Sequence, residues 1–446
     1  MLMAQVYRWM VVIRVHSKNI LFMQFENTLS FAQQLDSTDP LKDFRNKFIV
    51  PESNGKQHIY FLGNSLGLQP RSANRYLQQI MQDWADLGVE AFFHAKEPWI
   101  NYHDLLIHPL SKIVGALPHE VVVMNQLTVN LHLMLVSFYK PSAKRYKIIC
   151  EAKAFPSDQY TFETHVKHHG FDPDDAIIEV SPRAGEHSIR SDDILSAIGE
   201  SSDSTALVLF SGINYYSGQL FDMAAITKAA QSAGAKVGFD LAHAAGNIDM
   251  RLHDWSVDFA CWCSYKYLNS GPGGIGGVFI HEKNHDRDLP RFAGWWGYDK
   301  TTRFKMEKGF IPMAGAEGWQ LSTPALFLYA AHRASLEIFE EAGWSNILAK
   351  QKLLNNFLWF LLDELSRMAA GKSIQFITPK NSAERGSQVS LLMFQRGREV
   401  FDFLTRKNIM VDWREPNVIR IAPVPLYNTF EEVWQFADTL QQILKA

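Results

Sequence analysis

The chain has 446 residues, of which 47% are hydrophobic and 13% aromatic. That is ample for a large core, and it predicts two or three domains, or one large and one small domain. The formal net charge is −3, so no strongly basic face is implied and nucleic-acid binding gains no support. Only Cys150, Cys261 and Cys263 occur, which excludes a disulfide framework or a spaced zinc-ligand set and fits a reducing, cytoplasmic interior.

Residues 1–25 differ from the rest of the chain. They contain three basic residues and no acid before Glu26, and their longest apolar run, 9–13, is far too short to span a bilayer. A transit peptide would also be basic and poor in acids, but serine is scarce here. We therefore expect residues 1–25 to be a disordered extension, and we expect no membrane association, because no other segment approaches a transmembrane length.

Strand-like and helix-like patterns alternate through the middle of the chain. The predicted strands are short apolar runs at 121–125, 146–150, 205–211, 236–240, 258–264 and 276–281. Helical patterns lie between them: 127–139, a helix that Ser157 would cap, and a helix from an Asp222 cap to Gly234. Buried apolar strands separated by helices predict an α/β domain with a mostly parallel sheet that is covered on both faces.

The pattern changes after residue 323. Residues 324–370 predict two long helices, and strands follow at 389–395, 408–413 and 417–423. Thr429 and Glu432 have the spacing of a capping box that opens the last helix. We therefore divide the chain into four parts. They are an extension (1–25), an N-terminal segment that contributes to the small domain (26–115), a large α/β domain (116–325), and connecting helices with a smaller α+β domain (326–446).

Several polar residues follow the predicted strands. Thr128, Asp158, Asp240 and Lys266 fall at strand ends, and His243 comes three residues after Asp240. Ligands of open α/β sheets bind outside the carboxyl ends of the strands. A lysine that forms a Schiff base, a carboxylate that pairs with a pyridinium nitrogen, and a helix N-terminus that holds a phosphate are what a pyridoxal phosphate enzyme requires.

Each of these residues also has an ordinary structural interpretation. Lys266, in "CSYKYLNSGPGG", could snorkel to water from a strand end instead of staying neutral as a nucleophile. Asp240 and Thr128 could be helix N-caps, and His243 could be a hydrogen-bonded core histidine. An aspartate at one strand end, followed one strand later by a lysine before a glycine-rich turn, favours the cofactor, but the spacing alone leaves both interpretations open.

Longer blocks of sequence indicate a family. "FACWCSYKYLNSGPGG", "VGFDLAHAAGN", "FLGNSLGLQP", "FSGINYYSGQ" and "IRIAPVPLYN" closely resemble the kynureninase family of fold-type-I pyridoxal phosphate hydrolases. The resemblance runs from about Phe25 to the C-terminus. It implies the fold of that class, a large domain with a mostly parallel sheet and a smaller C-terminal α+β domain.

The resemblance also implies which residues form the cofactor pocket. Lys266 forms the Schiff base, and Asp240 pairs with the pyridinium nitrogen. The other implied cofactor contacts are Leu127, Thr128, Phe155, Pro156, Ser157, Asp158, Ser211, His243 and Tyr265. Among these, the Leu127 backbone and Thr128 hold the phosphate, and Phe155 lies on the ring face.

The resemblance places further residues on the substrate side. Tyr216 would organise a proton transfer at the reacting carbon. Arg420, in "VIRIAP", would grip the α-carboxylate with its planar fork, although without the resemblance a surface arginine on an edge strand is the better interpretation. Ser65 and His94 match substrate-binding positions, and the alignment around His94 needs a gap.

Two residues imply a homodimer with shared active sites. Trp295 and Thr323 match positions that contact the cofactor or substrate from the neighbouring subunit. Thr323 stands where family members often carry asparagine, so its contact with the aryl end of the substrate could differ in geometry.

The implied reaction is the hydrolysis of the Cβ–Cγ bond of L-kynurenine or 3-hydroxykynurenine to an anthranilate and L-alanine, in tryptophan catabolism and NAD biosynthesis. One alternative is a cysteine desulfurase or small-group aminotransferase, but a desulfurase needs a mobile cysteine on a late loop and none follows Cys263. Another is a non-catalytic pyridoxal-binding regulator, whose marks would be a missing lysine or a fused DNA-binding module, and the sequence shows neither.

Overall fold

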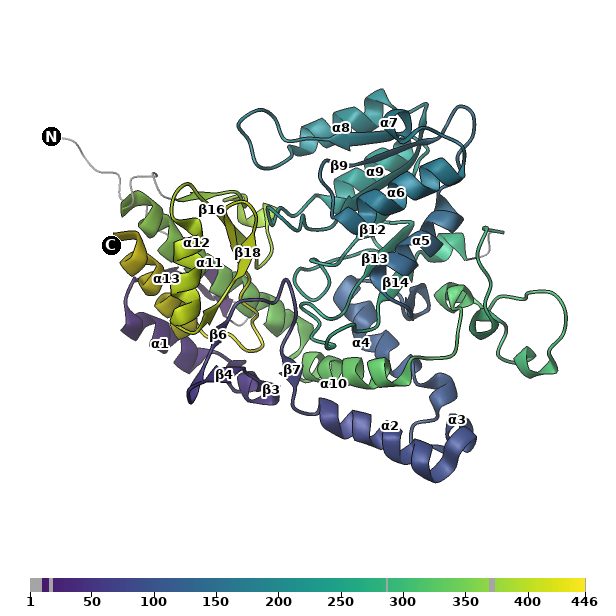
Figure 1. Ribbon diagram of the computed structural model, residues 1–446, viewed down its shortest axis with the longest axis horizontal. Helices are drawn as coiled ribbons and strands as arrows, with labels where there is room; N and C mark the ends of the chain where they lie inside the picture. The colour runs from purple at the N-terminus through teal and green to yellow at the C-terminus, as the bar shows by residue number, and fades with distance from the viewer. Residues whose placement is uncertain (1–9, 16–18, 286–287, 369–373, 446) are drawn as a thin grey trace.

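The structure is a computed structural model, and it describes residues 10–15, 19–285, 288–368 and 374–445. Figure 1 shows two bodies: a large α/β body, drawn mainly in teal, and a smaller body in yellow and green near both termini. Two long helices, α10 (Leu326–Ala342) and α11 (Trp344–Met368), follow the large body in sequence and lead to the small one. They are the two helices that the sequence predicts for 324–370.

A seven-stranded sheet forms the centre of the large body. Its strand order is β10-β9-β11-β12-β13-β14-β8. All neighbouring strands are parallel except β14, which is antiparallel to both β13 and β8. In chain order the strands are β8 (Val121–Val123), β9 (Lys147–Glu151), β10 (Ile177–Val180), β11 (Thr205–Ser211), β12 (Lys236–Asp240), β13 (Phe259–Trp262) and β14 (Gly277–Ile280). The predicted mostly parallel sheet is confirmed.

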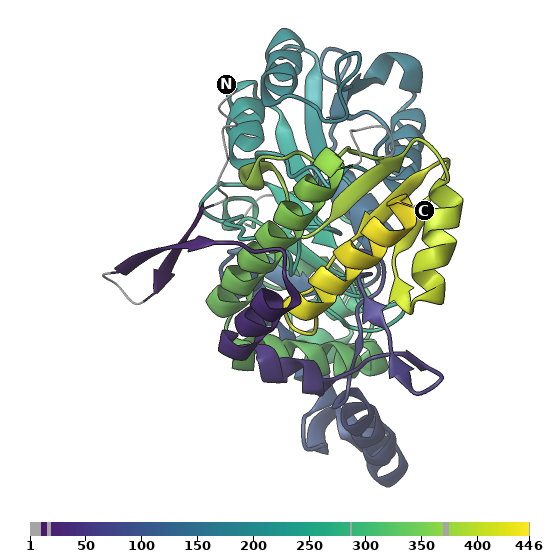
Figure 2. The same ribbon diagram turned by 90° about the vertical axis from the view of Figure 1, so that its left-hand side faces the viewer.

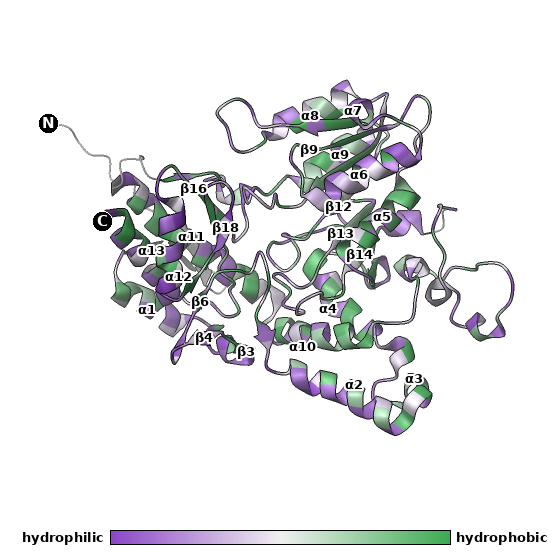
Figure 3. Ribbon diagram, viewed as in Figure 1, coloured by the Kyte–Doolittle hydropathy of each residue, from purple (hydrophilic) through white to green (hydrophobic). Residues whose placement is uncertain are grey.

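Hydrophobic residues cover both faces of this sheet. Along β11, Val208 and Phe210 belong to one buried cluster, whereas Leu207 and Leu209 belong to another. This alternation is the period of two expected for a strand that is buried on both sides, and each such side chain contributes about 1.5–3 kcal/mol when fully buried. The helices that follow the strands are α5 (Leu127–Phe138), α6 (Pro156–His168), α7 (Pro173–Ala176), α8 (Ser191–Glu200) and α9 (Met223–Ser232). In Figure 3 these helices carry both apolar and polar residues, as expected of helices that cover a sheet.

The small body is a four-stranded antiparallel sheet with the order β15-β16-β19-β18. Its elements are β15 (Ile374–Phe376), β16 (Val389–Met393), α12 (Gly397–Arg406), β17 (Ile409–Met410), β18 (Asp412–Arg414), β19 (Val418–Ile421) and α13 (Phe430–Lys445). One buried cluster joins this sheet to α11 and α13. The predicted smaller α+β domain is therefore present.

The N-terminal segment contributes to both bodies. Ala32 and Leu35 of α1 (Leu29–Thr38) belong to the core of the small body, and β6 (Ile59–Tyr60) pairs with β17. Farther along, α2 (Ala73–Leu87) and α4 (Asp104–Val114) pack against α10, and the short α3 (Ala91–His94) lies at the end of α2 (Figure 1). The other short strand pairs of this segment are β3 (Phe48–Ile49) with β7 (Gln69–Pro70) and β4 (Glu52–Ser53) with β5 (Lys56–Gln57). The predicted domain boundaries themselves stay a prediction.

Residues 10–15 and 19–24 form strands in a segment that the sequence predicts to be disordered. Strands β1 (Met10–Val15) and β2 (Asn19–Gln24) pair antiparallel, and Figure 2 shows the pair projecting from the molecule. Both strands are rich in β-branched and other apolar residues, which favour extended pairing. Residues 1–9 and 16–18 of the predicted extension lie outside the described residues. Among the described residues, no helix is both long enough and apolar enough to cross a bilayer.

Two of the three predicted helix caps are present. Thr429 Oγ1 accepts a hydrogen bond from Glu432 N at 3.1 Å, and Glu432 Oε2 accepts one from Thr429 N at 3.2 Å, which completes the capping box. Asp222 caps α9 by accepting from Ala225 N. Ser157 is not a cap, because α6 begins at Pro156 and Phe155 is its N-cap residue. Proline favours the first helical position, and it sets the start of α6 earlier than predicted.

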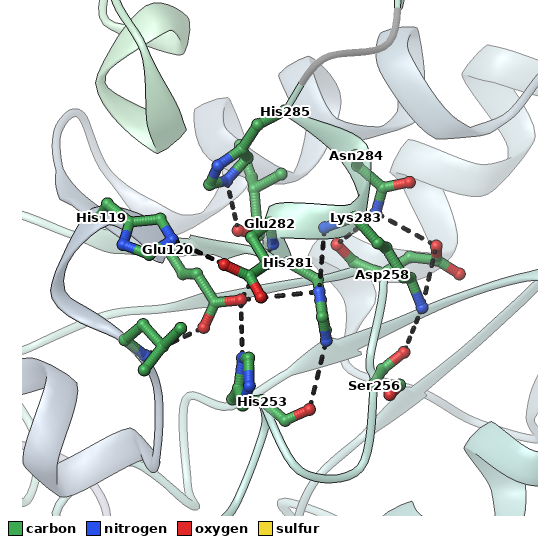
Figure 4. Close-up of polar contacts among 12 residues, drawn as sticks. His119, Glu120, His253, Ser256, Asp258, His281, Glu282, Lys283, Asn284 and His285 are labelled. Carbon is green, nitrogen blue, oxygen red and sulfur yellow. Dashed lines mark hydrogen bonds and ion pairs between the residues drawn. The ribbon is translucent and has the colours of Figure 1, made fainter.

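A polar cluster fastens the loops at the edge of the sheet where β8 and β13 begin (Figure 4). Glu120 is fully buried there, and its Oε1 lies 2.9 Å from His253 Nδ1 and 3.5 Å from His281 Nδ1. Glu120 also accepts hydrogen bonds from the backbone N–H groups of Leu117 and Glu282. His281 Nδ1 accepts from Lys283 N, and its Nε2 contacts the His253 carbonyl. Because neighbouring groups already satisfy the hydrogen-bonding atoms of Glu120 and His281, the cluster serves to hold these loops together.

Candidate active site

A cavity of about 250 Å³ opens at the edge of the sheet where the parallel strands end. Its walls come from the segments that follow β8, β9, β11, β12 and β13, so the expected convergence of strand ends occurs. The lining residues are Gln126, Leu127, Thr128, Phe155, Ser157, Asp158, Ser211, Ile213, Tyr215, Asp240, Ala242, His243, Tyr265 and Lys266. A larger cavity of about 540 Å³ lies elsewhere, beside the first turns of α8 and α9, and no lysine lines it.

Lys266 lies four residues after β13 and extends into the cavity. Its Nζ is 2.9 Å from His243 Nε2, 5.9 Å from the ring centroid of Phe155 and 6.0 Å from that of Tyr265. Burial, and then the positive charge of Lys266, lower the pKa of His243 well below its ordinary value. The imidazole is therefore neutral and accepts from the lysine at Nε2, so its proton is on Nδ1, for which the described residues offer no acceptor.

Two buried acids face Lys266 across the cavity. Asp240 ends β12 and Asp158 lies in the first turn of α6, and both carboxyls are almost fully buried. Burial raises the pKa of both, and that of Asp158 is raised the further because Asp240 lies beside it and accepts its hydrogen bond. Asp240 also accepts a hydrogen bond from Ala242 N at 2.7 Å, as a capping aspartate would. The same residue lines the cavity, so the two interpretations of Asp240 are compatible.

The N-terminus of α5 forms another wall of the cavity. Gln126, Leu127 and Thr128 all line it, and no side chain caps this helix. The first N–H groups of a helix have no intrahelical acceptor, and the helix dipole adds partial positive charge at the same place. This end of the cavity can therefore bind an anion such as a phosphate.

The "GINYY" turn brings a different tyrosine to the cavity from the one predicted. Tyr215 lines the wall, and its ring makes an edge contact with Phe155 at 5.2 Å. Tyr216 does not line the cavity, although its ring lies 6.3 Å from that of Tyr215. Pro156, the first residue of α6, does not line the cavity either, although its neighbours Phe155 and Ser157 do.

Arg420 lies behind this cavity wall. It is 1% exposed and lies on β19, an inner strand of the small sheet, so it is not the surface arginine of an edge strand. Its Nε and Nη2 donate to Asp412 Oδ2, and its Nη1 donates to the carbonyl of Tyr215. Arg420 therefore joins the small body to the cavity through Tyr215.

The remaining predicted substrate-side residues lie outside this cavity. His94 is exposed and lies 3.5 Å from Glu90, and Ser65 N donates to the Leu62 carbonyl. Trp295 is 44% exposed and Thr323 is also exposed. None of these four residues lines the cavity of its own chain. The segment of Ser65 nevertheless lies close to Lys266, because Gly67 N donates to the Tyr265 carbonyl.

Sequence reasoning missed four lining residues, Gln126, Ile213, Tyr215 and Ala242. Each is a neighbour of a predicted residue or, for Ile213, belongs to the recognised "FSGINYYSGQ" block. In the glycine-rich turn after Lys266, Gly271 and Gly273 have φ values of +88° and +66°, and neither lines the cavity, so they serve the turn.

Sequence comparison identifies the family. A kynureninase from Flavobacterium psychrophilum is 56% identical over 421 residues, covering 94% of this chain and 99% of the relative. A kynureninase from Nematostella vectensis is 47% identical and covers 93% of this chain and 94% of the relative. The family model described as the kynureninase C-terminal domain matches residues 347–440. The chain belongs to the kynureninase family. The predicted family and its enzyme class, a pyridoxal phosphate-dependent hydrolase acting on carbon–carbon bonds, are thereby confirmed.

Solved structures confirm the fold. A cysteine desulfurase from Thermococcus onnurineus NA1 has a TM-score of 0.73 at 19% identity, and covers 91% of this chain and 98% of its own. The cystine C–S lyase C-DES has a TM-score of 0.71 at 18% identity, and covers 86% of this chain and 97% of its own. At these identities the likeness shows the fold alone, that of the fold-type-I pyridoxal phosphate enzymes.

Proposed function

We propose that the cavity around Lys266 binds pyridoxal 5′-phosphate and hydrolyses the Cβ–Cγ bond of L-kynurenine or 3-hydroxykynurenine. The products would be an anthranilate and L-alanine, as in tryptophan catabolism and NAD biosynthesis. One observation carries this assignment: an amine, a buried acid pair and an uncapped helix N-terminus line the same small cavity.

The residues of the cavity fit the cofactor. The α5 N-terminus offers N–H donors to a phosphate, and Phe155 offers an aromatic face. Asp158 Oδ1 and His243 Nδ1 are buried polar atoms without a partner among the described residues. Buried polar groups are normally hydrogen-bonded, so these two indicate a polar ligand.

When bound, pyridoxal phosphate supplies an electron-accepting ring that stabilises negative charge at the substrate Cα. Lys266 Nζ would hold the cofactor and, with the substrate bound, would take the proton from Cα. Asp240 holds a proton at the ring nitrogen, since a carboxylate there favours the charged form of the base. His243, neutral beside Lys266 Nζ, can accept a hydrogen bond from the amine without adding a competing positive charge.

The substrate side uses Arg420 and the two adjacent tyrosines. Arg420 binds the α-carboxylate through N–H donors that Asp412 and Tyr215 leave available. Tyr216 moves a proton to Cβ after the bond breaks, and burial raises the pKa of its phenol, which keeps that proton in place at neutral pH. Tyr215, which lines the cavity, is the second candidate for this role.

A desulfurase activity is not favoured, although the solved neighbours include desulfurases. That chemistry needs a thiolate that can reach the substrate. All three cysteines of the chain are buried, and burial raises their pKa values. The same free, unpaired thiols support a reducing compartment, and we propose the cytoplasm.

We further propose a homodimer in which each subunit completes the site of the other. Trp295 and Thr323 are exposed and lie outside the cavity of their own chain. Trp295 belongs to an exposed aromatic group, in which the ring of Phe304 lies 5.6 Å from Trp295 and 6.1 Å from Phe93. A contiguous exposed apolar group of this kind is typical of an interface.

The test is covalent trapping of the cofactor. Protein reconstituted with pyridoxal phosphate should show a visible absorption band, and borohydride reduction should fix the label on Lys266, as peptide mapping would reveal. Lys266→Ala should lose the adduct and the release of fluorescent anthranilate from either substrate. A label on another lysine would refute the assignment of the cavity.

A further inference from the structure

A third buried acid, Glu151, lies next to the cavity but does not line it. It is the last residue of β9 and is 1% exposed. Both of its carboxylate oxygens accept from Ser211 N at 3.1 Å, and Oε1 also accepts from Ser211 Oγ. The Glu151 carboxylate therefore accepts hydrogen bonds from both the backbone N–H and the hydroxyl of one residue, Ser211.

Ser211 connects Glu151 to the cavity wall. It ends β11, lines the cavity, and stands opposite Asp240 in the parallel register of β11 and β12. Because the Ser211 hydroxyl donates its proton to Glu151, its lone pairs remain available on the cavity side. Glu151, Ser211 and Asp240 thus end three neighbouring strands, β9, β11 and β12.

The charges around Glu151 are unbalanced. The charge of Asp240 acts on Glu151, and Asp158 and the thiol of Cys150 feel the charge of Glu151. The positive charge of Lys266 acts on Asp158 and Asp240. Among the described residues, no lysine, arginine or histidine pairs with Glu151. Burial raises the pKa of Glu151 to about 7, and the charge of Asp240 adds to this, whereas the hydrogen bonds from Ser211 act in the opposite direction.

A purely structural role would need only an acceptor for the Ser211 N–H and hydroxyl. A glutamine carbonyl oxygen could accept from both groups and would avoid the cost of burying an ionisable group. The Glu151 carboxyl forms no ion pair among the described residues and contacts Ser211, which lines the cavity. Its negative charge therefore indicates a role in that cavity.

We propose that Glu151 is a positioning residue of the cofactor pocket, which fixes the Ser211 hydroxyl and sets the negative potential that Asp240 presents to the cofactor. The inference rests on the proposed function, because it assumes that pyridoxal phosphate is the group bound beside Asp240. As pH rises through neutrality Glu151 loses its proton, and its charge then favours protonated cationic groups on the bound cofactor.

The test is the pH titration of the visible band of bound pyridoxal phosphate, which requires no turnover. Glu151→Gln retains an acceptor for Ser211 but removes the charge. The midpoint of the titration should move to lower pH by about half a unit or more, because a nearby negative charge raises the pKa of a cation. Glu179→Gln is the matched control, since Glu179 lies exposed on the adjacent strand β10, and its midpoint should equal that of the unmodified protein.

Ser211→Ala provides an independent measurement if Glu151→Gln does not fold. Loss of the hydroxyl removes a hydrogen bond that helps to keep Glu151 ionised, so this midpoint should also fall. In the double variant, Ser211→Ala should shift the midpoint little beyond the shift caused by Glu151→Gln alone. Both substitutions act through the charge of Glu151, which Glu151→Gln already removes. A midpoint unchanged in Glu151→Gln, or in Ser211→Ala where that variant alone is soluble, overturns the inference. Absence of a visible band in the unmodified protein would instead refute the proposed function.

Discussion

Arg420 is held by contacts from two parts of the molecule. Asp412, on the neighbouring strand β18, accepts from Nε and Nη2, and the carbonyl of Tyr215 accepts from Nη1. Burial lowers the pKa of the guanidinium and Asp412 opposes that effect. These contacts fix the plane of the guanidinium, which is what bidentate recognition of a carboxylate requires.

We predict that Arg420→Lys impairs substrate binding although it keeps the positive charge. An ammonium cannot form the planar fork, and loss of a bidentate contact in a dry site costs about 2–4 kcal/mol, or roughly a 30- to 1,000-fold loss in kcat/KM. Steady-state kinetics would measure this effect, and the melting temperature would separate it from unfolding. If Arg420→Lys keeps both KM and kcat/KM, Arg420 has a structural role only.

Sequence reasoning located the reactive end of the site better than the substrate end. Lys266, Asp240 and His243 follow apolar strands at short spacing, so the parallel sheet alone brings them together. The contact between Arg420 and Asp412 depends instead on the antiparallel register of β18 and β19, which places the two residues opposite each other. Glu151 was missed although it follows the predicted strand 146–150, because its contact with Ser211 of the neighbouring strand β11 depends on the sheet order.

Elements with strong local signals were predicted closely. The predicted strands 205–211 and 236–240 have the observed bounds of β11 and β12. Strand β10 (Ile177–Val180) was missed because Glu179 interrupts its apolar residues and because the strand follows α7 directly. For residues 10–15 and 19–24 the prediction of disorder rested on basic character, whereas the apolar runs of β1 and β2 favour extended strands.

At the level of elements, the pair of Glu120 and His253 joins the loop before β8 to the loop before β13. Burial acts to raise the pKa of Glu120, but hydrogen bonds from Glu282 N, His253 and Leu117 N outweigh it, and the net pKa is lowered. The hydrogen bond with Glu120 raises the pKa of His253. The carboxylate thus stabilises the fold above its ordinary pKa of 4.5, and the imidazolium does so below its ordinary pKa of 6.5.

We predict that Glu120→Gln lowers stability most between these two values. At about pH 6 the loss should be about 1–3 kcal/mol, because a buried hydrogen bond to a charged group is removed. The difference from the unmodified protein should shrink as pH rises through the raised pKa of His253, and also as pH falls through the lowered pKa of Glu120. Denaturant unfolding at several pH values would measure it.

The matched control for this experiment is Glu282→Gln. Glu282 pairs with His119 at 3.1 Å in the same cluster, but both side chains are about half exposed. Exposed pairs contribute little, so this variant should change stability by less than about 0.5 kcal/mol. A loss in Glu120→Gln that is constant from pH 5 to 9 would contradict the assigned charge states.

At the scale of the whole molecule, exposed apolar residues gather where the proposed dimer would form. Met81, Trp84, Val89 and Phe93 are all about half exposed or more, and they lie on α2, on α3 or in the turn between them. Figure 1 shows α2 and α3 along one edge of the large body, away from the small sheet. The contacts from Phe93 to Phe304 and from Phe304 to Trp295 extend this surface to the residue proposed to reach the neighbouring site.

Subunit complementation tests whether the active site is shared. Lys266→Ala and Trp295→Ala proteins, each nearly inactive alone, would be mixed under conditions that allow exchange. A heterodimer then has one site with both defects and one with neither, so statistical mixing should restore up to about a quarter of the unmodified activity. The control mixture is Lys266→Ala with Asp240→Ala. Both of these residues line the cavity of their own chain, so every heterodimer site keeps one defect and no activity should return. If exchange is proven by differently tagged subunits and the first mixture recovers no more than the control, each site is built within one chain, and Trp295 acts only in packing.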